Sequence, residues 1–171
     1  MDVTLRPVRP DDEELLCRVY ASTRTEELAA VPWSEERKAA FLRMQFEAQH
    51  RYYQEHYAGA EFSVVLAGGR PAGRLYVARW PEEIRLVDIS VLPEHRGRGV
   101  GSKLLGDLLR EGEEKGLPVR IHVERMNPAL RLYERLGFRV AADRGVYLFL
   151  EWRPGPPVAA GATLAPRAEG T

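Results

Sequence analysis

Apolar side chains recur along the chain with two different periods, which predicts a mixed α/β protein. Runs rich in β-branched and aromatic residues predict strands over residues 3–8, 62–67, 73–80, 84–92, 119–123 and 146–152. Longer segments with apolar residues three and four positions apart predict helices over residues 10–29, 34–57, 99–115 and 128–136. The predicted order is β-α-α-β-β-β-α-β-α-β, an α/β sandwich.

Local signals mark the ends of several of these elements. Residues 68–71, Gly-Gly-Arg-Pro, lie between two predicted strands and indicate a hairpin. Gly116 follows a helical pattern at the place where a glycine commonly ends a helix. Beyond residue 152 the chain is rich in Pro, Gly and Ala and has few large apolar side chains. We therefore expect one folded domain over residues 1–152 and a disordered tail over residues 153–171.

The overall composition is that of an ordinary globular chain with a small partner. The 171 residues include 25 basic and 25 acidic side chains, so a net charge of zero gives no general attraction to nucleic acid or anionic lipid. The first residues lack the charged-then-apolar order of a signal peptide, and no apolar run approaches the roughly 18 residues of a membrane helix. We expect a cytoplasmic protein that binds neither nucleic acid nor membrane.

The cysteine and histidine content argues against a metal site. Cys17 is the single cysteine, so neither an internal disulfide nor a multi-cysteine zinc site can form, and its apolar neighbours predict a buried structural thiol. His50 and His56 are six residues apart on a predicted helix, which is not the spacing of a zinc-binding pair. The sequence therefore predicts no metal cofactor.

A glycine-rich segment between a strand and an amphipathic helix carries the clearest chemical signal. Gly97, Gly99 and Gly101 alternate just where the helix over residues 99–115 begins, so the backbone can approach a ligand and the unpaired amides of the helix start can bind an anion. Positive charge comes from four neighbouring side chains, His95, Arg96, Arg98 and Lys103. The segment predicts a phosphate or pyrophosphate site, although its spacing fits neither a Walker loop nor the dinucleotide fingerprint.

This segment resembles the acyl-CoA loop of the GNAT family, the Gcn5-related N-acetyltransferases. The resemblance rests on residues 96–101, Arg-Gly-Arg-Gly-Val-Gly, and on the preceding strand. A second segment, from Asn127 to Phe138, resembles the family's Asn...Ala...Leu-Tyr...Leu-Gly-Phe helix, and the element order agrees over residues 3–152. The resemblance implies an α/β fold with a mixed central β-sheet flanked by helices and splayed between its fourth and fifth strands, where acetyl-CoA lies.

The resemblance also implies which residues bind the cosubstrate. The backbone of Ile89, Ser90 and Val91 would pair with the pantetheine arm. The loop amides would hold the pyrophosphate, and they belong to Gly97, Arg98, Gly99, Val100, Gly101 and Ser102. Asn127 is counted with this cofactor-binding set, although its residue type and the following proline also suit a helix cap.

Tyr133 matches the family's general acid, whose hydroxyl protonates the departing thiolate. With an unperturbed pKa of about 10, a tyrosine keeps its proton at neutral pH and can serve in this role. Without the resemblance, the neighbouring Leu132 and Leu136 would favour a core aromatic residue instead.

A general base is needed because an amine with a pKa near that of lysine, about 10, arrives as an ammonium ion. The candidates near the splay are Glu83, Asp88, His122 and Glu124. Glu83 takes the place of the glutamate of histone-type members when residues are counted back from the glycine loop, and His122 takes the place of the base of ribosomal-protein members when they are counted back from Asn127. We favour His122, because an ordinary pKa of about 6.5 suits neutral pH, and keep Glu83 second.

The sequence therefore predicts an N-acetyltransferase that moves the acetyl group of acetyl-CoA to a primary amine by direct attack in a ternary complex. The acceptor would be a small-molecule or peptide amine. A largely aromatic set could contact it, although an ordinary core is the better explanation of these residues: Trp33, Phe41, Gln45, His50, Tyr52, Tyr53 and Tyr57. A homodimer is left open. The alternatives are a non-catalytic acyl-CoA sensor or regulatory module and, less favoured, a nucleotide-phosphate module.

Overall fold

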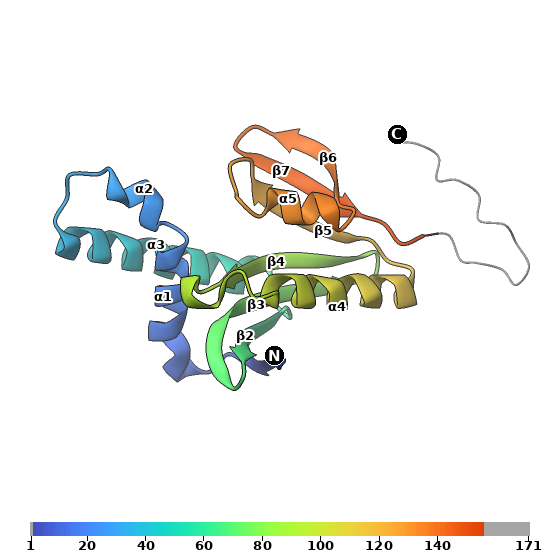
Figure 1. Ribbon diagram of the computed structural model, residues 1–171, viewed down its shortest axis with the longest axis horizontal. Helices are drawn as coiled ribbons and strands as arrows, with labels where there is room; N and C mark the ends of the chain where they lie inside the picture. Colours follow the sequence, from blue (N-terminus) through green and yellow to red (C-terminus); the bar gives the residue numbers. More distant parts are fainter. Residues whose placement is uncertain (1, 156–171) are drawn as a thin grey trace, which may run out of the picture.

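The computed structural model describes residues 2–155 and contains one seven-stranded sheet with helices on both faces (Figure 1). The strand order is β1-β2-β3-β4-β5-β7-β6, and every neighbouring pair is antiparallel except β4 and β5. The strands are β1 (Val3–Pro7), β2 (Glu61–Ala67), β3 (Arg70–Trp80), β4 (Glu83–Val91), β5 (Val119–Glu124), β6 (Arg139–Arg144) and β7 (Tyr147–Trp152). The predicted tail lies, from residue 156 on, outside the described residues.

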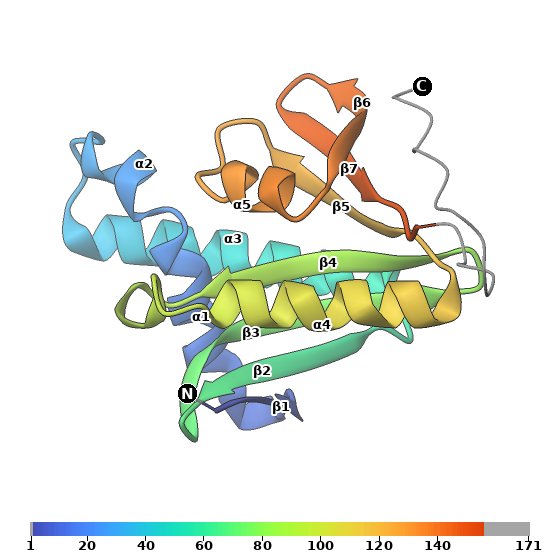
Figure 2. The ribbon, with the colours of Figure 1, turned by 45° about the vertical axis from the view of Figure 1, so that its right-hand side comes forward.

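The one parallel pair is also the place where the sheet opens. β4 and β5 are in register only at Ile84↔Val119, Arg85↔Arg120 and Leu86↔Ile121. Beyond these pairs the two strands diverge, and Figure 2 shows them close together at one end and far apart at the other. The expectation of a mixed sheet splayed between its fourth and fifth strands is therefore confirmed.

Helix α4 (Val100–Lys115) covers one face of the sheet and forms its main core. Its apolar stripe, including Leu104, Leu105 and Leu108, packs with alternate residues of β3, β4 and β5 in one buried cluster. The short α5 (Leu130–Arg135) adds Tyr133 to the same cluster. The helix that follows the glycine loop and the helix of the second motif therefore pack into the same hydrophobic core.

The opposite face carries α1 (Glu13–Ser22) and the long α3 (Glu35–His56). Alternation along β3 separates the faces: Leu75 belongs to the core under α4, whereas Arg74 and Tyr76 contact α3 through Gln49 and Tyr53. Within residues 2–155, no helix has the length and apolar character needed to cross a membrane.

The first helix is shorter than predicted. The pattern predicts a helix over residues 10–29, but the chain forms the 3-10 turn η1 (Pro10–Asp12), α1, and a separate α2 (Thr25–Ala29). The break coincides with hydroxyl groups that bond backbone carbonyls: Ser22 Oγ donates to Val19 O at 2.7 Å and Thr23 Oγ1 to Tyr20 O at 2.6 Å. Such local bonds compete with the helix ladder, so the helix ends there.

Strand β6 is absent from the sequence prediction. It is an edge strand in which only Ala142 is half-buried and the other residues are exposed, so its sequence shows no alternation of apolar and polar positions. Its pairing with β7 gives it its shape, and the register shifts between Val140 and Ala142.

Helix α3 agrees closely with its predicted range. Ser34 Oγ accepts a hydrogen bond from the Arg37 amide at 3.1 Å and caps the start of the helix.

A charged pair ties β1 to the start of α1 and makes stability depend on pH. Arg6 donates to both oxygens of Asp12 at 2.8 Å, and the Arg9 amide donates to Asp12 Oδ2 at 2.7 Å. The Arg6 hydrogen bonds, helped by the Arg9 amide, lower the pKa of Asp12 to about 2. A carboxylate whose folded-state pKa is depressed stabilises the fold above its unfolded pKa of about 3.9, and the contribution is lost as pH falls toward the folded value.

We therefore expect Asp12→Asn to lower the free energy of unfolding at neutral pH by about 1–2 kcal/mol, a discount from the full linkage value because Arg6 stays partly exposed. The difference from wild type should shrink between about pH 4 and pH 2, as Asp12 is protonated in the wild-type chain. Urea unfolding at a series of pH values measures it. A constant difference over that range would show that Asp12 acts through packing alone.

Candidate active site

The glycine loop has the backbone shape that an anion site requires. After β4 the chain forms η2 (Pro93–His95), and Gly97 and Gly99 then adopt left-handed conformations with φ of 74° and 83°. Gly99 is the N-cap of α4. Arg96 Nε donates to Val91 O at 2.8 Å and fastens the loop to the end of β4. Other residue types are strained at positive φ, so glycine is needed at both positions.

The loop amides are available to a ligand. Within residues 2–155, none of the backbone amides of residues 97–102 donates a hydrogen bond, because they precede the first full turn of α4. Arg98 is exposed and has no partner in the described part of the chain, whereas Lys103 Nζ is paired with Asp107 at 2.8 Å. The row of amides at a helix start, with Arg98 beside it, can bind a phosphate or pyrophosphate.

The predicted pantetheine-binding strand has an open edge. Ile89, Ser90 and Val91 pair with β3 on one side, at Leu75↔Ile89, Arg74↔Ser90 and Gly73↔Val91. On the other side β5 has already diverged, since its last pair with β4 is at Leu86. The backbone on that edge can therefore bond to an extended ligand that continues the sheet.

Tyr133 lies in α5 close to this edge. Its side chain is 2 % exposed and packs edge-on against Phe138, with ring centroids 5.4 Å apart. Burial, and then the negative charge of Asp88 on β4, raise the pKa of Tyr133 well above its usual range. The hydroxyl makes no hydrogen bond within the described residues. Tyr133 is therefore protonated at neutral pH, with a proton that no neighbour engages.

Asp88, the acidic candidate nearest the splay, is already held by three groups. Arg74 Nη2 donates to its Oδ2 at 2.9 Å, the Tyr53 hydroxyl donates to the same oxygen at 2.9 Å, and Ser90 Oγ donates to Oδ1 at 2.9 Å. Arg74 is 2 % exposed, and its guanidinium places a buried positive charge beside the negative charge of the Asp88 carboxylate. Both carboxylate oxygens of Asp88 are therefore already engaged by hydrogen-bond donors.

The two favoured bases have different surroundings. Glu83 is 7 % exposed, at the closed end of the β4–β5 pair, and its two oxygens accept from Arg85 at 2.8 Å and Arg120 at 3.2 Å. His122 follows the last pair on β5 and its ring is exposed, 4.6 Å from the centre of the Phe149 ring. Partial burial, and then the positive charges of Arg85 and Arg144, lower the pKa of His122 below its ordinary value.

The remaining candidates lie farther from the splay or serve local structure. Asn127 Oδ1 accepts from the Ala129 amide at 2.8 Å, which closes the turn before α5. Glu124 is paired with Arg24 at 3.1 Å. The aromatic set does not form one cage: it is divided into separate contacts along α3, such as Trp33 with Phe41 at 5.3 Å and Tyr57 with Trp80 at 6.1 Å.

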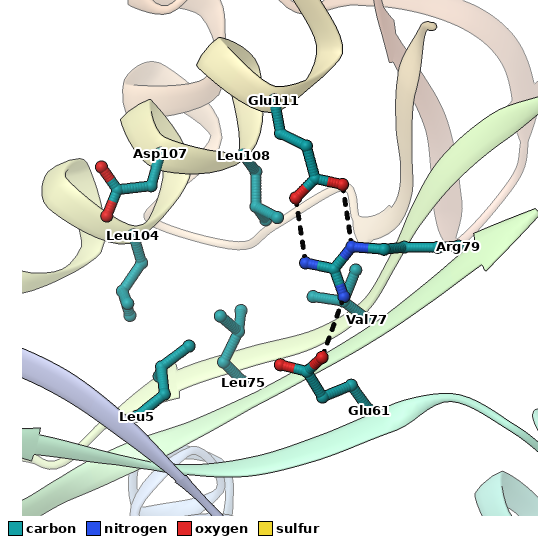
Figure 3. A pocket seen from close by; sticks show the side chains of 9 residues that line it. All are labelled: Leu5, Glu61, Leu75, Val77, Arg79, Leu104, Asp107, Leu108 and Glu111. Atoms are coloured by element: carbon teal, nitrogen blue, oxygen red, sulfur yellow. Dashed lines mark hydrogen bonds and ion pairs between the residues drawn. The ribbon is translucent and has the colours of Figure 1, made fainter. Parts of the chain in front are cut away.

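A small pocket lies on the α4 face of the sheet, near β1 and away from the glycine loop (Figure 3). Leu5, Leu75 and Leu108 are among its apolar walls, and Arg79 spans its rim, donating to Glu111 at 2.8 and 3.0 Å and to Glu61 at 3.2 Å. These ion pairs hold α4 against β2 and β3. The pocket brings together none of the predicted site residues.

Comparison with known proteins agrees with this geometry. The sequence profile described as the acetyltransferase (GNAT) family matches residues 21–138, which include β4, the glycine loop, α4, β5 and α5. The chain belongs to this family. The assignment to the GNAT family, which the two sequence motifs predicted, is therefore confirmed.

Individual GNAT relatives are similar over parts of the chain. The [ribosomal protein bS18]-alanine N-acetyltransferase of Haemophilus influenzae is 40% identical over 67 residues, 39% of this chain and 46% of that protein. Streptothricin acetyltransferase of Streptomyces lavendulae is 35% identical over 81 residues, 45% of this chain and 43% of that protein. The chain thus spans less than half the length of these two curated relatives.

A solved GNAT structure shares the fold over nearly the whole chain. The PaiA N-acetyltransferase of Thermoplasma acidophilum, determined in complex with coenzyme A, superposes with a TM-score of 0.67 at 20% identity and covers 90% of this chain and 99% of that one. At this level of identity the likeness shows the fold.

Sequence reasoning missed the side chains that surround His122. Arg85 and Arg144 lie 5.1 and 5.4 Å from the centre of the Phe149 ring, which itself contacts His122. No local motif marks these residues. The pairing of β4 with β5, of β5 with β7 and of β7 with β6 brings them together, and β6 carries no pattern that predicts a strand.

Proposed function

We propose that this GNAT protein transfers the acetyl group of acetyl-CoA to a primary amine by direct attack in a ternary complex. The observation that carries the proposal is the open edge of β4 at residues 89–91, which leads directly to the unpartnered amides of residues 97–102. An extended chain with a pyrophosphate at one end, as in acetyl-CoA, matches this order of binding groups.

The chain's own groups supply the proton transfers. The uncharged amine nitrogen attacks the thioester carbonyl carbon, and a backbone amide on the open edge of β4 stabilises the negative charge that develops on the carbonyl oxygen. As the carbon–sulfur bond breaks, the Tyr133 hydroxyl donates its proton to the departing thiolate. The base takes the proton that the nitrogen loses, which leaves an acetylated amine and free CoA.

We assign the base role to His122 rather than Glu83. His122 is exposed beside the splay and its lowered pKa keeps it neutral, hence able to accept a proton, at neutral pH. Both oxygens of Glu83 are already held by Arg85 and Arg120, and Glu83 lies at the closed end of the β4–β5 pair, away from the open edge of β4.

This assignment predicts the shape of the pH profile. In the wild-type protein, kcat/KM is expected to fall on the acidic side only below pH 6.5. The His122 ring must be unprotonated to act as a base, and its pKa is lowered from the ordinary value of 6.5. His122→Gln should lose that limb and about a hundredfold in kcat/KM. Glu83→Gln is the comparison variant and should keep the limb. An unchanged limb in His122→Gln, with the same acceptor amine, would make this base assignment wrong.

Two assays separate the proposed function from its alternatives. Protection against thermal unfolding by CoA, but not by ATP or NAD, is expected for an acyl-CoA site, and protection by all three would favour a general nucleotide-phosphate module. Release of free thiol from acetyl-CoA upon addition of mixed primary amines is expected for the transferase. Protection by CoA without amine-dependent thiol release would favour a non-catalytic acyl-CoA sensor.

A further inference from the structure

Two arginines and a histidine surround one phenylalanine ring beside the splay. We call Arg85, His122, Arg144 and Phe149 the Phe149 cluster. The Arg85 and Arg144 guanidinium carbons lie 5.1 and 5.4 Å from the centre of the Phe149 ring, and the His122 ring centre lies 4.6 Å from it. The cluster therefore places two cationic groups around the residue to which we assign the base role.

Strand register explains this arrangement. His122 on β5 is directly opposite Phe149 on β7, and Arg144 on β6 is opposite Tyr147, two residues from Phe149. Arg85 pairs with Arg120 in the second of the three β4–β5 pairs, just before the strands diverge. Alternate positions on these strands, such as Leu86 and Ile121, belong to the core under α4. The cluster thus lies on the opposite face of the sheet from α4.

The carboxylates near this face are already paired with arginines. Glu83 is held by Arg85 and Arg120, and Glu151 accepts from Arg120 at 2.8 Å. Further out, Glu124 is paired with Arg24 and Asp143 with Arg125. Each of these four carboxylates is therefore already paired with an arginine. None of them is free to bind a second ammonium group of an acceptor.

The positive charge of the cluster, by contrast, is not fully matched. Arg144 has no carboxylate partner within residues 2–155. Arg85 bonds Glu83 through Nη2, but its buried Nε finds no hydrogen-bond partner in the described part of the chain. After burial, the charges of both arginines lower the pKa of His122, against the opposing effect of Glu83. The surplus charge beside the reacting amine is therefore positive.

We propose that the acceptor is a small amine carrying a carboxylate close to its amino group, as in an amino acid, and that Arg144, with Arg85, binds the carboxylate. The proposal rests on the proposed function and names its substrate class. Guanidinium groups bind carboxylates through charge-assisted hydrogen bonds, whereas an additional ammonium group would be repelled here. Bound in this way, the acceptor would present its amine on the face where His122 lies. Polyamines are accordingly poor acceptors.

The test compares acceptors that differ only in the anionic group. Amino acids, their carboxamides and the corresponding decarboxylated amines are assayed with acetyl-CoA at one pH, and kcat/KM is measured for each. We expect the carboxylates to exceed their carboxamides by about ten- to a hundredfold, although the carboxamide amines are less basic and therefore more often uncharged. Arg144→Gln should bring the carboxylate-to-carboxamide ratio close to one, and Arg144→Lys should restore part of it.

Arg70→Gln is the matched control, since Arg70 is an exposed arginine at the β2–β3 turn, and its ratio should equal that of the wild type. Equal kcat/KM for carboxylates and carboxamides in the wild type, or an unchanged ratio in Arg144→Gln, overturns the inference while leaving the acetyltransferase assignment standing. Acetylation of none of the amines overturns the proposed function and this inference with it.

Discussion

Replacement of Tyr133 by phenylalanine is expected to lower kcat by about a hundred- to ten-thousandfold and to leave the Kd for CoA unchanged. The substitution removes only the oxygen whose proton would reach the departing thiolate. Because this hydroxyl makes no hydrogen bond within residues 2–155, its loss breaks no contact of the described fold, and the Phe138 ring contact is retained. Steady-state kinetics and calorimetric titration with CoA measure the two effects.

Tyr53→Phe separates this effect from the general loss of a buried hydroxyl. The Tyr53 hydroxyl donates to Asp88 at 2.9 Å, so its removal should lower the melting temperature, whereas Tyr133→Phe should leave it near the wild-type value. If Tyr133→Phe keeps the wild-type kcat under conditions where the chemical step limits the rate, Tyr133 is a packing residue and the acid role is lost.

Gly101→Val is expected to weaken CoA binding by about a hundredfold, because a branched side chain at the start of α4 obstructs the approach of a pyrophosphate to the loop amides. The fold should survive. A Cβ atom at this helical position would meet only Leu132 Cδ2, at 3.9 Å, which is an ordinary contact. Calorimetric titration gives the Kd, and circular dichroism verifies that the variant is folded.

Gly106→Val is the matched control within the same helix. Its added Cβ would meet nothing within 4 Å, and it introduces the same β-branched residue farther along α4, away from the loop amides. It should therefore carry the same helix-propensity cost and bind CoA normally. Equal CoA affinities of a folded Gly101→Val and of Gly106→Val would mean that the loop is only a structural turn.

The elements that bury a full apolar stripe were predictable from the sequence. Helix α4 follows from its leucine spacing, and the glycine loop follows from three glycines at a strand-to-helix junction. By contrast, β6 is exposed on an edge and carries no periodic pattern, and the break after Ser22 depends on hydroxyl bonds that propensity does not describe. The splay of the sheet was predicted from the family resemblance, because apolar periodicity does not reveal where two paired strands diverge.

The site was predictable only in part, for a similar reason. The residues of the two motifs are close in sequence, so their spacing pointed to the loop and to Tyr133. The partners that distinguish Glu83 from His122 are distant: Arg120 is brought to Glu83 by the parallel register of β4 and β5, and Arg144 reaches Phe149 through β6 and β7. Counting along the sequence cannot show which carboxylate an arginine already neutralises. The roles of these residues remain predictions.

The most direct test of the account follows the acetyl group itself. The protein is incubated with acetyl-CoA alone and then with acetyl-CoA and the amine panel, and mass spectrometry records the intact protein, the amines and free CoA. Direct transfer predicts an unmodified protein in both mixtures and, only when an amine is present, one acetylated amine for each CoA released. Free CoA without any acetylated amine, or an acetyl group bound covalently to the protein, would contradict it.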